Sequence, residues 1–289
     1  MKLKKIGIPR ISIYNKDGVL IKNFFLYLGY KIVLSNIEKE KYNNDLVANT
    51  CSYIKNYYEH IISLKNSCDY IIISNNCDYY QKCQKYKQLI SNINCHLDKS
   101  QLLIINQNKI QLLEYLKIGF KLTKNPLKII ISYLLAKEKQ RKHNINKINH
   151  EKNKLNSTKI KVLMVANYNN IENNIIAKYI INKLKKQDIK VLLSNYTKEK
   201  EAIIHSSYYE YKVREKETKK LVGAIYYYRY SIRGIIYLNN KNCLLDKYII
   251  NTIRNAIKEI PIINISIEEE IDNIETTLNI LIKEINKYN

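Results

Sequence analysis

The chain alternates short β-branched runs with longer segments of helical periodicity, and it does so in both halves. Four such runs lie in the first half, at residues 5–9, 31–35, 69–74 and 102–105. Four more lie in the second half, at residues 161–165, 190–193, 234–238 and 261–265. Parallel strands need a long crossover connection, which is usually a helix, so this alternation is typical of βαβ units. We therefore predict an α/β protein with mostly parallel sheets.

The segment between the two halves follows a different pattern. Apolar residues recur at helical spacing through residues 110–142, and Pro126 interrupts them. We expect Pro126 to begin a new helix, because proline is tolerated in the first turn and not in the interior. Residues 141–158 are polar and weakly periodic, and we place the domain boundary there. The predicted organisation has an N-terminal α/β domain, a helical connector and linker, and a C-terminal α/β domain, both domains being Rossmann-like, at residues 1–109, 110–158 and 159–289.

Composition argues against a membrane protein and against a secreted one. No apolar run approaches the roughly 20 residues of a membrane span. Residues 1–5 lead directly into a strand pattern, without the apolar stretch of a signal peptide. We therefore expect a cytoplasmic protein with no membrane association, in which six cysteines are poor indicators of disulfides.

The formal net charge of +23 would attract polyanions such as nucleic acids or the phosphates of CoA. The lysines are spread along the chain and are not gathered on one segment, so nucleic-acid binding is not favoured. The chain has six glycines and neither a P-loop nor a Gly-x-Gly-x-x-Gly motif. We therefore do not expect it to bind ATP by itself.

Three of the six cysteines stand where a metal cluster would bind. Cys83 and Cys243 each follow a buried-type strand after a polar stretch, and Cys51 stands just ahead of a helical segment. Ligands of open parallel sheets bind outside the carboxyl ends of the strands. Thiolates are the soft ligands that iron–sulfur clusters require. On the residues alone, the alternative is that these cysteines are small buried hydrophobic residues.

The remaining candidate ligands give weaker signals. Cys68 and Cys95 are interpreted as packing or surface residues, whereas Cys77 lies six residues before Cys83 and is an alternative ligand. The absence of a Cys-x-x-Cys pair disfavours a zinc site. The five histidines form no spaced pair for a metal or for a nucleophile relay.

Several short motifs, taken in their order along the chain, resemble those of a known protein family. The chain opens with Ile6-Gly7-Ile8-Pro9-Arg10, and its first cysteine context is Thr50-Cys51-Ser52-Tyr53-Ile54-Lys55. The second cysteine context is Lys82-Cys83-Gln84-Lys85, and the third follows Arg233-Gly234-Ile235-Ile236 as Asn242-Cys243. In these contexts and in their order, the chain resembles the 2-hydroxyacyl-CoA dehydratase D-component family. That family includes 2-hydroxyglutaryl-CoA dehydratase beta-like proteins and benzoyl-CoA reductase-related iron–sulfur subunits.

The resemblance implies a cofactor, a reaction and partners. It implies that Cys51, Cys83 and Cys243 ligate a [4Fe–4S] cluster in the cleft between the two domains, with one iron left without a protein thiolate. It further implies that an ATP-dependent activator protein delivers a low-potential electron to this cluster, for reductive chemistry on an acyl-CoA thioester in an anaerobe. The chain would then be a 2-hydroxyacyl-CoA dehydratase, which is a lyase, or a related reductase component, in a homo- or heterodimer.

The chain also departs from the family pattern around the cysteines. Both glycines and the proline expected around Cys243 are missing, as are the prolines after Cys51 and Cys83. Neighbouring groups tune a cluster's reduction potential, so these changes bear on catalysis. The alternative is a degenerate, non-catalytic family member that acts as a binding or assembly subunit.

Overall fold

The computed structural model describes residues 3–13, 17–36, 50–75, 83–106, 111–166, 171, 174–208 and 216–287. The chain divides into two compact units, Met1–His143 and Asn144–Asn289. Each unit contains a four-stranded sheet in which every strand pair is parallel. The predicted α/β class with two Rossmann-like, mostly parallel sheets is therefore confirmed.

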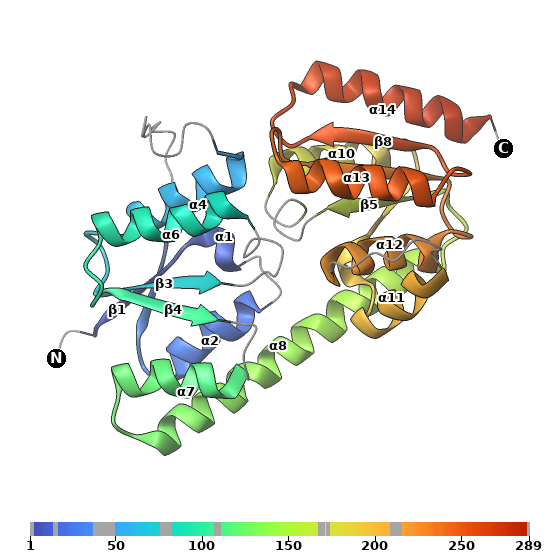
Figure 1. Cartoon of the computed structure of the whole chain (residues 1–289). Helices are drawn as coiled ribbons and strands as arrows, with labels where there is room; N and C mark the ends of the chain where they lie inside the picture. Colours follow the sequence, from blue (N-terminus) through green and yellow to red (C-terminus); the bar gives the residue numbers. More distant parts are fainter. Residues whose placement is uncertain are drawn as a thin grey trace. The chain divides into compact units, whose positions relative to one another are not determined.

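The first unit is a three-layer α/β arrangement around the sheet order β2-β1-β3-β4. Its strands are β1 (Lys5–Ile8), β2 (Lys31–Leu34), β3 (Tyr70–Asn75) and β4 (Leu102–Asn106). Its helices include α1 (Arg10–Ile13), α2 (Gly18–Tyr27), α4 (Ser52–Ile62), α6 (Gln84–His96) and α7 (Gln111–Leu122). Helices α2 and α7 cover one face of this sheet, and α4 and α6 cover the other (Figure 1).

The second unit repeats this architecture with the sheet order β6-β5-β7-β8. Its strands are β5 (Lys161–Ala166), β6 (Lys190–Leu193), β7 (Gly234–Asn239) and β8 (Ile262–Ser266). Its helices include α10 (Ile175–Lys186), α11 (Glu199–His205), α12 (Lys216–Tyr228), α13 (Leu244–Ala256) and α14 (Ile271–Asn286), with two 3₁₀ turns at Ser194–Tyr196 and Ser206–Tyr208. The apolar faces of α10 and α14 form one core with the sheet.

The two units also share a detail of local structure at the end of their first crossover helix. After α2, Tyr30 N–H donates to the Phe25 carbonyl at 3.0 Å, and Gly29 has a positive φ of 91°. After α10, Ile189 N–H donates to the Leu184 carbonyl at 3.0 Å, and Asp188 has a φ of 59°. Both are Schellman ends, which turn the chain back into the next parallel strand. Gly29 supplies the left-handed conformation that this end of α2 requires.

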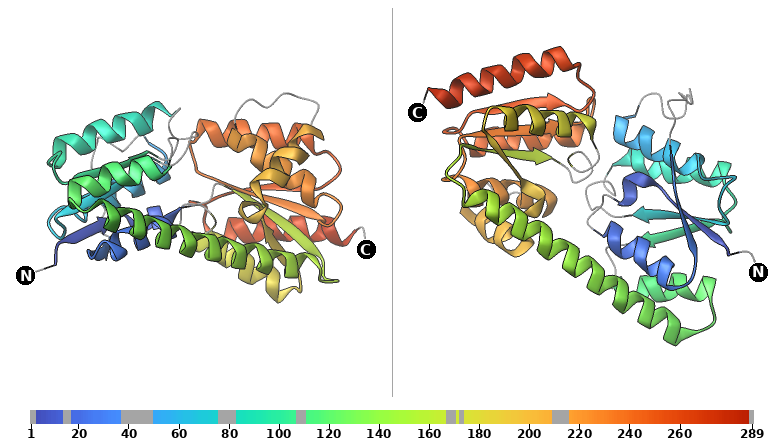
Figure 2. Two further views of the ribbon diagram at one scale, coloured as in Figure 1. Left: turned by 90° about the horizontal axis from the view of Figure 1, so that it is seen from below. Right: turned by 180° about the vertical axis from the view of Figure 1, so that it is seen from behind.

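Helix α8 (Pro126–Leu155) begins at the proline predicted to start it and continues well beyond residue 142 (Figure 2). It therefore runs through most of residues 141–158, where the sequence placed a polar linker. In the first unit, Gln140 on α8 accepts a hydrogen bond from the Leu20 amide at 2.9 Å. This side chain satisfies one of the amides that the first turn of α2 would otherwise leave unpaired.

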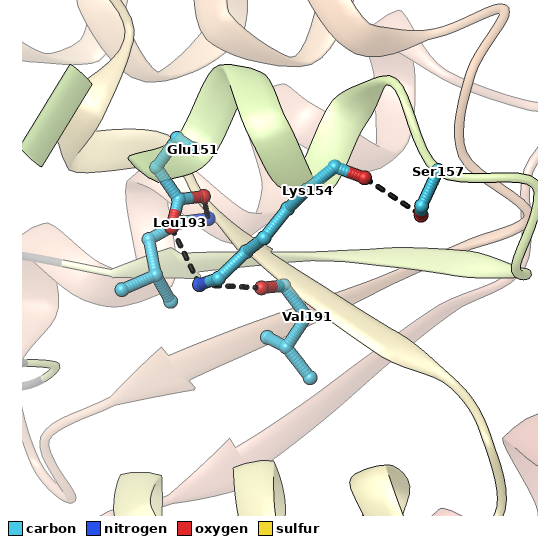
Figure 3. A network of polar contacts seen from close by, with 5 residues as sticks. All are labelled: Glu151, Lys154, Ser157, Val191 and Leu193. Carbon is cyan, nitrogen blue, oxygen red and sulfur yellow. Dashed lines mark hydrogen bonds and ion pairs between the residues drawn. The ribbon is translucent and has the colours of Figure 1, made fainter. Parts of the chain in front are cut away.

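The last turns of α8 hold the edge strand of the second sheet (Figure 3). The Glu151 carboxylate accepts from the Leu193 amide at 2.9 Å and from Lys154 Nζ at 2.6 Å. Lys154 Nζ also donates to the Val191 carbonyl at 3.3 Å. The side chain of Glu151 is 2% exposed, so this ion pair is shielded from water. These contacts pair backbone groups on the open side of β6, which would otherwise offer a template for another strand.

Candidate functional site

Each of the three candidate cysteines occupies the N-cap position of a helix. Cys51 precedes α4, Cys83 precedes α6 and Cys243 precedes α13. All three have extended backbone conformations, and all three are partly exposed. The amide groups of a helix's first turn point toward its N-cap and favour negative charge there. These positions therefore suit a thiolate or a metal-bound sulfur.

Cysteine at the N-cap is not explained by helix stability. The preferred N-cap residues are Asn, Asp, Ser and Thr, whose side-chain oxygens accept from first-turn amides. Asn174 does this for α10, because its Oδ1 accepts from the amides of Ile176 at 2.7 Å and Ala177 at 3.2 Å. The side chains of Cys51, Cys83 and Cys243 make no such capping bond. Capping therefore does not explain why cysteine occupies these positions.

The strand order places two of these cysteines at corresponding points of the two units. In each sheet, the second strand in sequence lies on one side of the first and the third strand lies on the other. The carboxyl ends of the first and third strands therefore form a topological switch point, where ligands bind in open α/β sheets. Cys83 begins the helix after the third strand, β3, and Cys243 begins the helix after its counterpart, β7. Cys51 begins the helix after β2.

A buried carboxylate builds the turn that presents Cys243. Asp246 is 1% exposed, and its Oδ2 accepts from the backbone amide and from Nδ2 of Asn240, both at 2.8 Å. The hydroxyl of Tyr237 donates to Asp246 Oδ1 at 3.1 Å. Burial, and then the charge of Asp246, raises the pKa of Tyr237 well above its ordinary value, which keeps this donor protonated. Asp246 thus ties the end of β7 to the first turn of α13.

Backbone hydrogen bonds stabilise the same turn on both sides of Cys243. The Cys243 amide donates to the Asn240 carbonyl at 3.2 Å, and its own carbonyl accepts from the Lys247 amide at 3.1 Å. Asn242 has a φ of 64°, a left-handed conformation that asparagine tolerates better than most residues. Helix α13 begins at Leu244, directly after its N-cap Cys243. The contacts of Asp246 stabilise this helix start.

A polar cluster that the sequence did not reveal joins the carboxyl end of β2 to α4. Ser35 is 1% exposed and its Oγ accepts from the Arg10 amide at 2.7 Å. The same Oγ lies 2.8 Å from Nδ1 of His60. Burial lowers the pKa of His60 to about 4, and the charge of Arg10 lowers it as well. The neutral imidazole can then accept a hydrogen bond from the Ser35 hydroxyl, which fixes α4, the helix that follows Cys51, to the end of β2.

The other cysteines do not share these surroundings. Cys68 is buried, and its Sγ lies 2.9 Å from the position that a Cβ on Gly7 would occupy. Burial raises the pKa of the Cys68 thiol, so this residue behaves as a packed apolar group, as expected. Cys77 lies outside the described residues, and the side chain of Cys95 is likewise not described.

The donor chemistry of Cys51, Cys83 and Cys243 fits an iron–sulfur cluster, since all three are partly exposed cysteines outside any disulfide. Cys51 and Cys83 belong to the first unit, and Cys243 belongs to the second. Within the described ranges, no group of three or more His, Cys, Asp or Glu side chains is already gathered to hold a metal ion. The structure therefore shows suitable ligands and helix ends, and no assembled metal centre among the residues it describes.

Comparison with protein families identifies the N-terminal two-thirds of the chain. Residues 5–196 match the family model described as the CoA enzyme activase uncharacterised domain (DUF2229). The chain belongs to this family. The family is related to the 2-hydroxyacyl-CoA dehydratase and activase proteins. The match spans the whole first sheet and continues through α8 into β5 and β6. It includes Cys51 and Cys83 and ends before Cys243.

Other comparisons add little. No curated protein matches the chain. One matching solved structure is a mutant, metal-free form of a periplasmic metal-binding protein from Candidatus Liberibacter asiaticus. The alignment covers 98% of this chain and 100% of the other, at 12% sequence identity. Its TM-score of 0.27 is too low to support an argument about this protein. Of the helices in the described part of the chain, none has both the length and the apolar character needed to cross a membrane.

Proposed function

We propose that this member of the CoA enzyme activase domain family is an iron–sulfur redox component similar to the 2-hydroxyacyl-CoA dehydratase D-components. Cys51, Cys83 and Cys243 are its proposed thiolate ligands, and a [4Fe–4S] cluster is the proposed cofactor. When bound, such a cluster would supply one-electron chemistry at low potential. The proposed substrate class is an acyl-CoA thioester.

The observation that carries the proposal is the repeated use of cysteine as a helix N-cap. Cys83 and Cys243 begin the helices that follow β3 and β7, at the switch points of two sheets with the same strand order. Cysteine is a poor cap, and it occupies the same position relative to the third strand of each sheet. The same residue in the same place in both units is best explained by one chemical task of the sulfur.

The residues around the proposed ligands would hold them in position. Asp246 fixes the turn before α13 through its bonds to Asn240 and Tyr237. Ser35 and His60 fix α4 to the end of β2. The three helix N-termini place backbone amides near the sulfurs, where amide donors favour the anionic form of a ligand and tune a cluster's potential.

The chain is better suited to receive an electron than to hydrolyse ATP. It contains six glycines and no phosphate-cradling glycine motif, so the ATP-dependent step is assigned to a separate activator protein. The net charge of +23 favours contact with the phosphates of an acyl-CoA. The proposed complex is a homo- or heterodimer that meets this activator.

The test is the iron and acid-labile sulfide content of protein purified without oxygen. About four irons per chain and a broad absorbance near 400 nm are expected for the wild type. Cys51→Ala, Cys83→Ala and Cys243→Ala should each lose iron and colour, whereas the control Cys68→Ala, at a buried cysteine away from the helix N-caps, should keep both. Circular dichroism establishes that each variant is folded.

A folded wild type without iron or colour would refute the proposal. The chain would then be better explained as a binding or assembly subunit that keeps the family fold without the chemistry. Equal iron loss in the Cys68 control would also count against the assignment of the three ligands, because it would show a general effect of cysteine removal.

A further inference from the structure

Between Leu127 and Ala136, α8 carries large apolar side chains both on its inward side and on its outward side. The inward side chains Ile129, Tyr133 and Ala136 are at most 3% exposed and belong to the core of the first unit. The outward side chains are also large and apolar, and their exposed fractions are 69% for Leu127, 37% for Ile130, 55% for Ile131, 56% for Leu134 and 49% for Leu135. A helix that is hydrophobic all round is normally buried all round.

The outward residues form a continuous stripe, which we call the outer α8 face (Leu127, Ile130, Ile131, Leu134 and Leu135). Leu127, Ile131 and Leu134 are spaced i, i+4 and i+7, so they lie in one row along the helix, opposite the buried row. Single exposed apolar residues are normal on a protein surface, but a contiguous group marks an interaction site. This spacing matches the anchors of helix-mediated docking.

Positive charges predominate around the outer α8 face. Exposed lysines flank it at Lys124, Lys128 and Lys137. The sequence from Tyr115 to Lys137 contains no Asp or Glu. The next acidic residue, Glu138, forms ion pairs with Arg141 and Lys142 on the same helix. Two copies of this chain meeting through this face would bring lysines against lysines, and like charges at an interface are unfavourable. A partner with carboxylates around an apolar patch would be complementary both to the stripe and to its rim.

We propose that the outer α8 face docks an acidic partner protein that presents an apolar helical surface rimmed by carboxylates. The docked partner would remove the leucine and isoleucine side chains from water and pair its carboxylates with the flanking lysines. The apolar contact would supply most of the affinity, and the charges would select the partner and speed association. This surface does not depend on the proposed cluster, because it contains none of the cysteines.

The test uses two labelled amphipathic peptides of about 20 residues, a length that covers the outer α8 face. Both carry the same leucine stripe, one with glutamates and one with lysines on its rim. The purified full chain is expected to bind the glutamate peptide at least about tenfold more tightly than the lysine peptide in fluorescence anisotropy. The double variant Leu127→Ser/Leu134→Ser should weaken this binding at least about tenfold. The control Ile280→Ser removes an apolar residue with 52% exposure on α14 and should leave it unchanged.

Three results would overturn the proposal, provided that thermal unfolding shows the variants folded. The first is equal binding of the two peptides, or equal binding by wild type and double variant. The second is a dimer of the wild type in sedimentation that the double variant loses, which would make this face a contact between copies. The third is binding to phosphatidylcholine–phosphatidylglycerol vesicles that the double variant loses, which would make it a lipid-binding face.

Discussion

The contact between Ser35 and His60 predicts a specific pH dependence of stability. His60 is an ordinary histidine with a pKa of 6.5 in the unfolded chain, but burial lowers its pKa to about 4 in the folded protein. As the pH falls, the unfolded chain therefore binds this proton first. The contribution of His60 to stability is fully present above about pH 6.5 and is lost as the pH falls toward 4.

The magnitude follows from the size of the shift. A change of one pKa unit corresponds to about 1.4 kcal/mol, so the lowering of the His60 pKa implies a loss of about 3 kcal/mol over this range. The variant His60→Asn removes the titrating group and keeps an oxygen close to the Nδ1 position, where it can accept from Ser35. At neutral pH we expect this variant to be less stable than the wild type by about 1–2 kcal/mol, because a partly buried ring is lost.

The assay is urea unfolding of both proteins, followed by far-UV circular dichroism, at intervals from about pH 7 to pH 4. Subtracting one unfolding free energy from the other removes the contribution of all other titrating groups, because the two proteins share those groups. It should change by about 3 kcal/mol in favour of the variant as the pH falls, and reverse its sign. His150→Asn, at an exposed position on α8, is the control. Its unfolding free energy should change with pH in the same way as that of the wild type.

Parallel curves for the wild type and His60→Asn across the whole range would refute the argument. They would show that His60 titrates alike in the folded and unfolded chains, and that the contact with Ser35 does not restrict its protonation. A change in the opposite direction would show that the folded protein stabilises the protonated imidazole.

Three further substitutions test the polar and steric contacts that shape the two units. Asp246→Asn should destabilise the protein by about 1–3 kcal/mol, because an amide N–H₂ would face the donors of Asn240; urea unfolding measures this. Glu151→Gln should cost about 2–4 kcal/mol by the same measurement, because it breaks a buried ion pair and weakens the bond to the Leu193 amide. Gly119→Ala should lower the midpoint of thermal unfolding by an amount equivalent to about 1–3 kcal/mol, because its Cβ would lie 2.5 Å from a side-chain carbon of α8.

For each of these three substitutions, a particular result would contradict the predicted loss of stability. Glu138→Gln is the matched control for Glu151→Gln, because Glu138 is on the same helix with a side chain 42% exposed, and it should change stability by less than about 0.5 kcal/mol. Equal losses in the two glutamine variants would show that burial is not the cause. Wild-type stability in Asp246→Asn or in Gly119→Ala would show that the surrounding turn or helix pair adjusts freely.

The sequence was sufficient for the elements whose signals are local. The β-branched runs predicted all eight strands in the described part of the chain, because strands buried on both faces read as continuous apolar runs. Pro126 predicted a helix start, because the backbone constraint of proline acts on the residue itself. The cysteines stood out for the same reason, since their contexts could be read from neighbouring residues.

Other features depend on residues far apart in the chain. His60 contacts a serine 25 residues away, and Gln140 caps a helix 120 residues away. Helix α8 continues through a polar segment because Glu151 binds an edge strand 42 residues further on. The carboxylate of Asp246, in the first turn of α13, binds the backbone of Asn240 just after β7.

The sequence by itself thus determined the class of fold, the order of the strands and helices along the chain, and the three cysteines as candidates, since these follow from periodicity and from single-residue constraints. The tertiary structure decided which strand lies beside which, and it made Cys83 and Cys243 counterparts at the switch points of two sheets. It also decided which polar groups are buried and paired. Strand order and burial arise from packing between distant segments, and no local pattern contains that information.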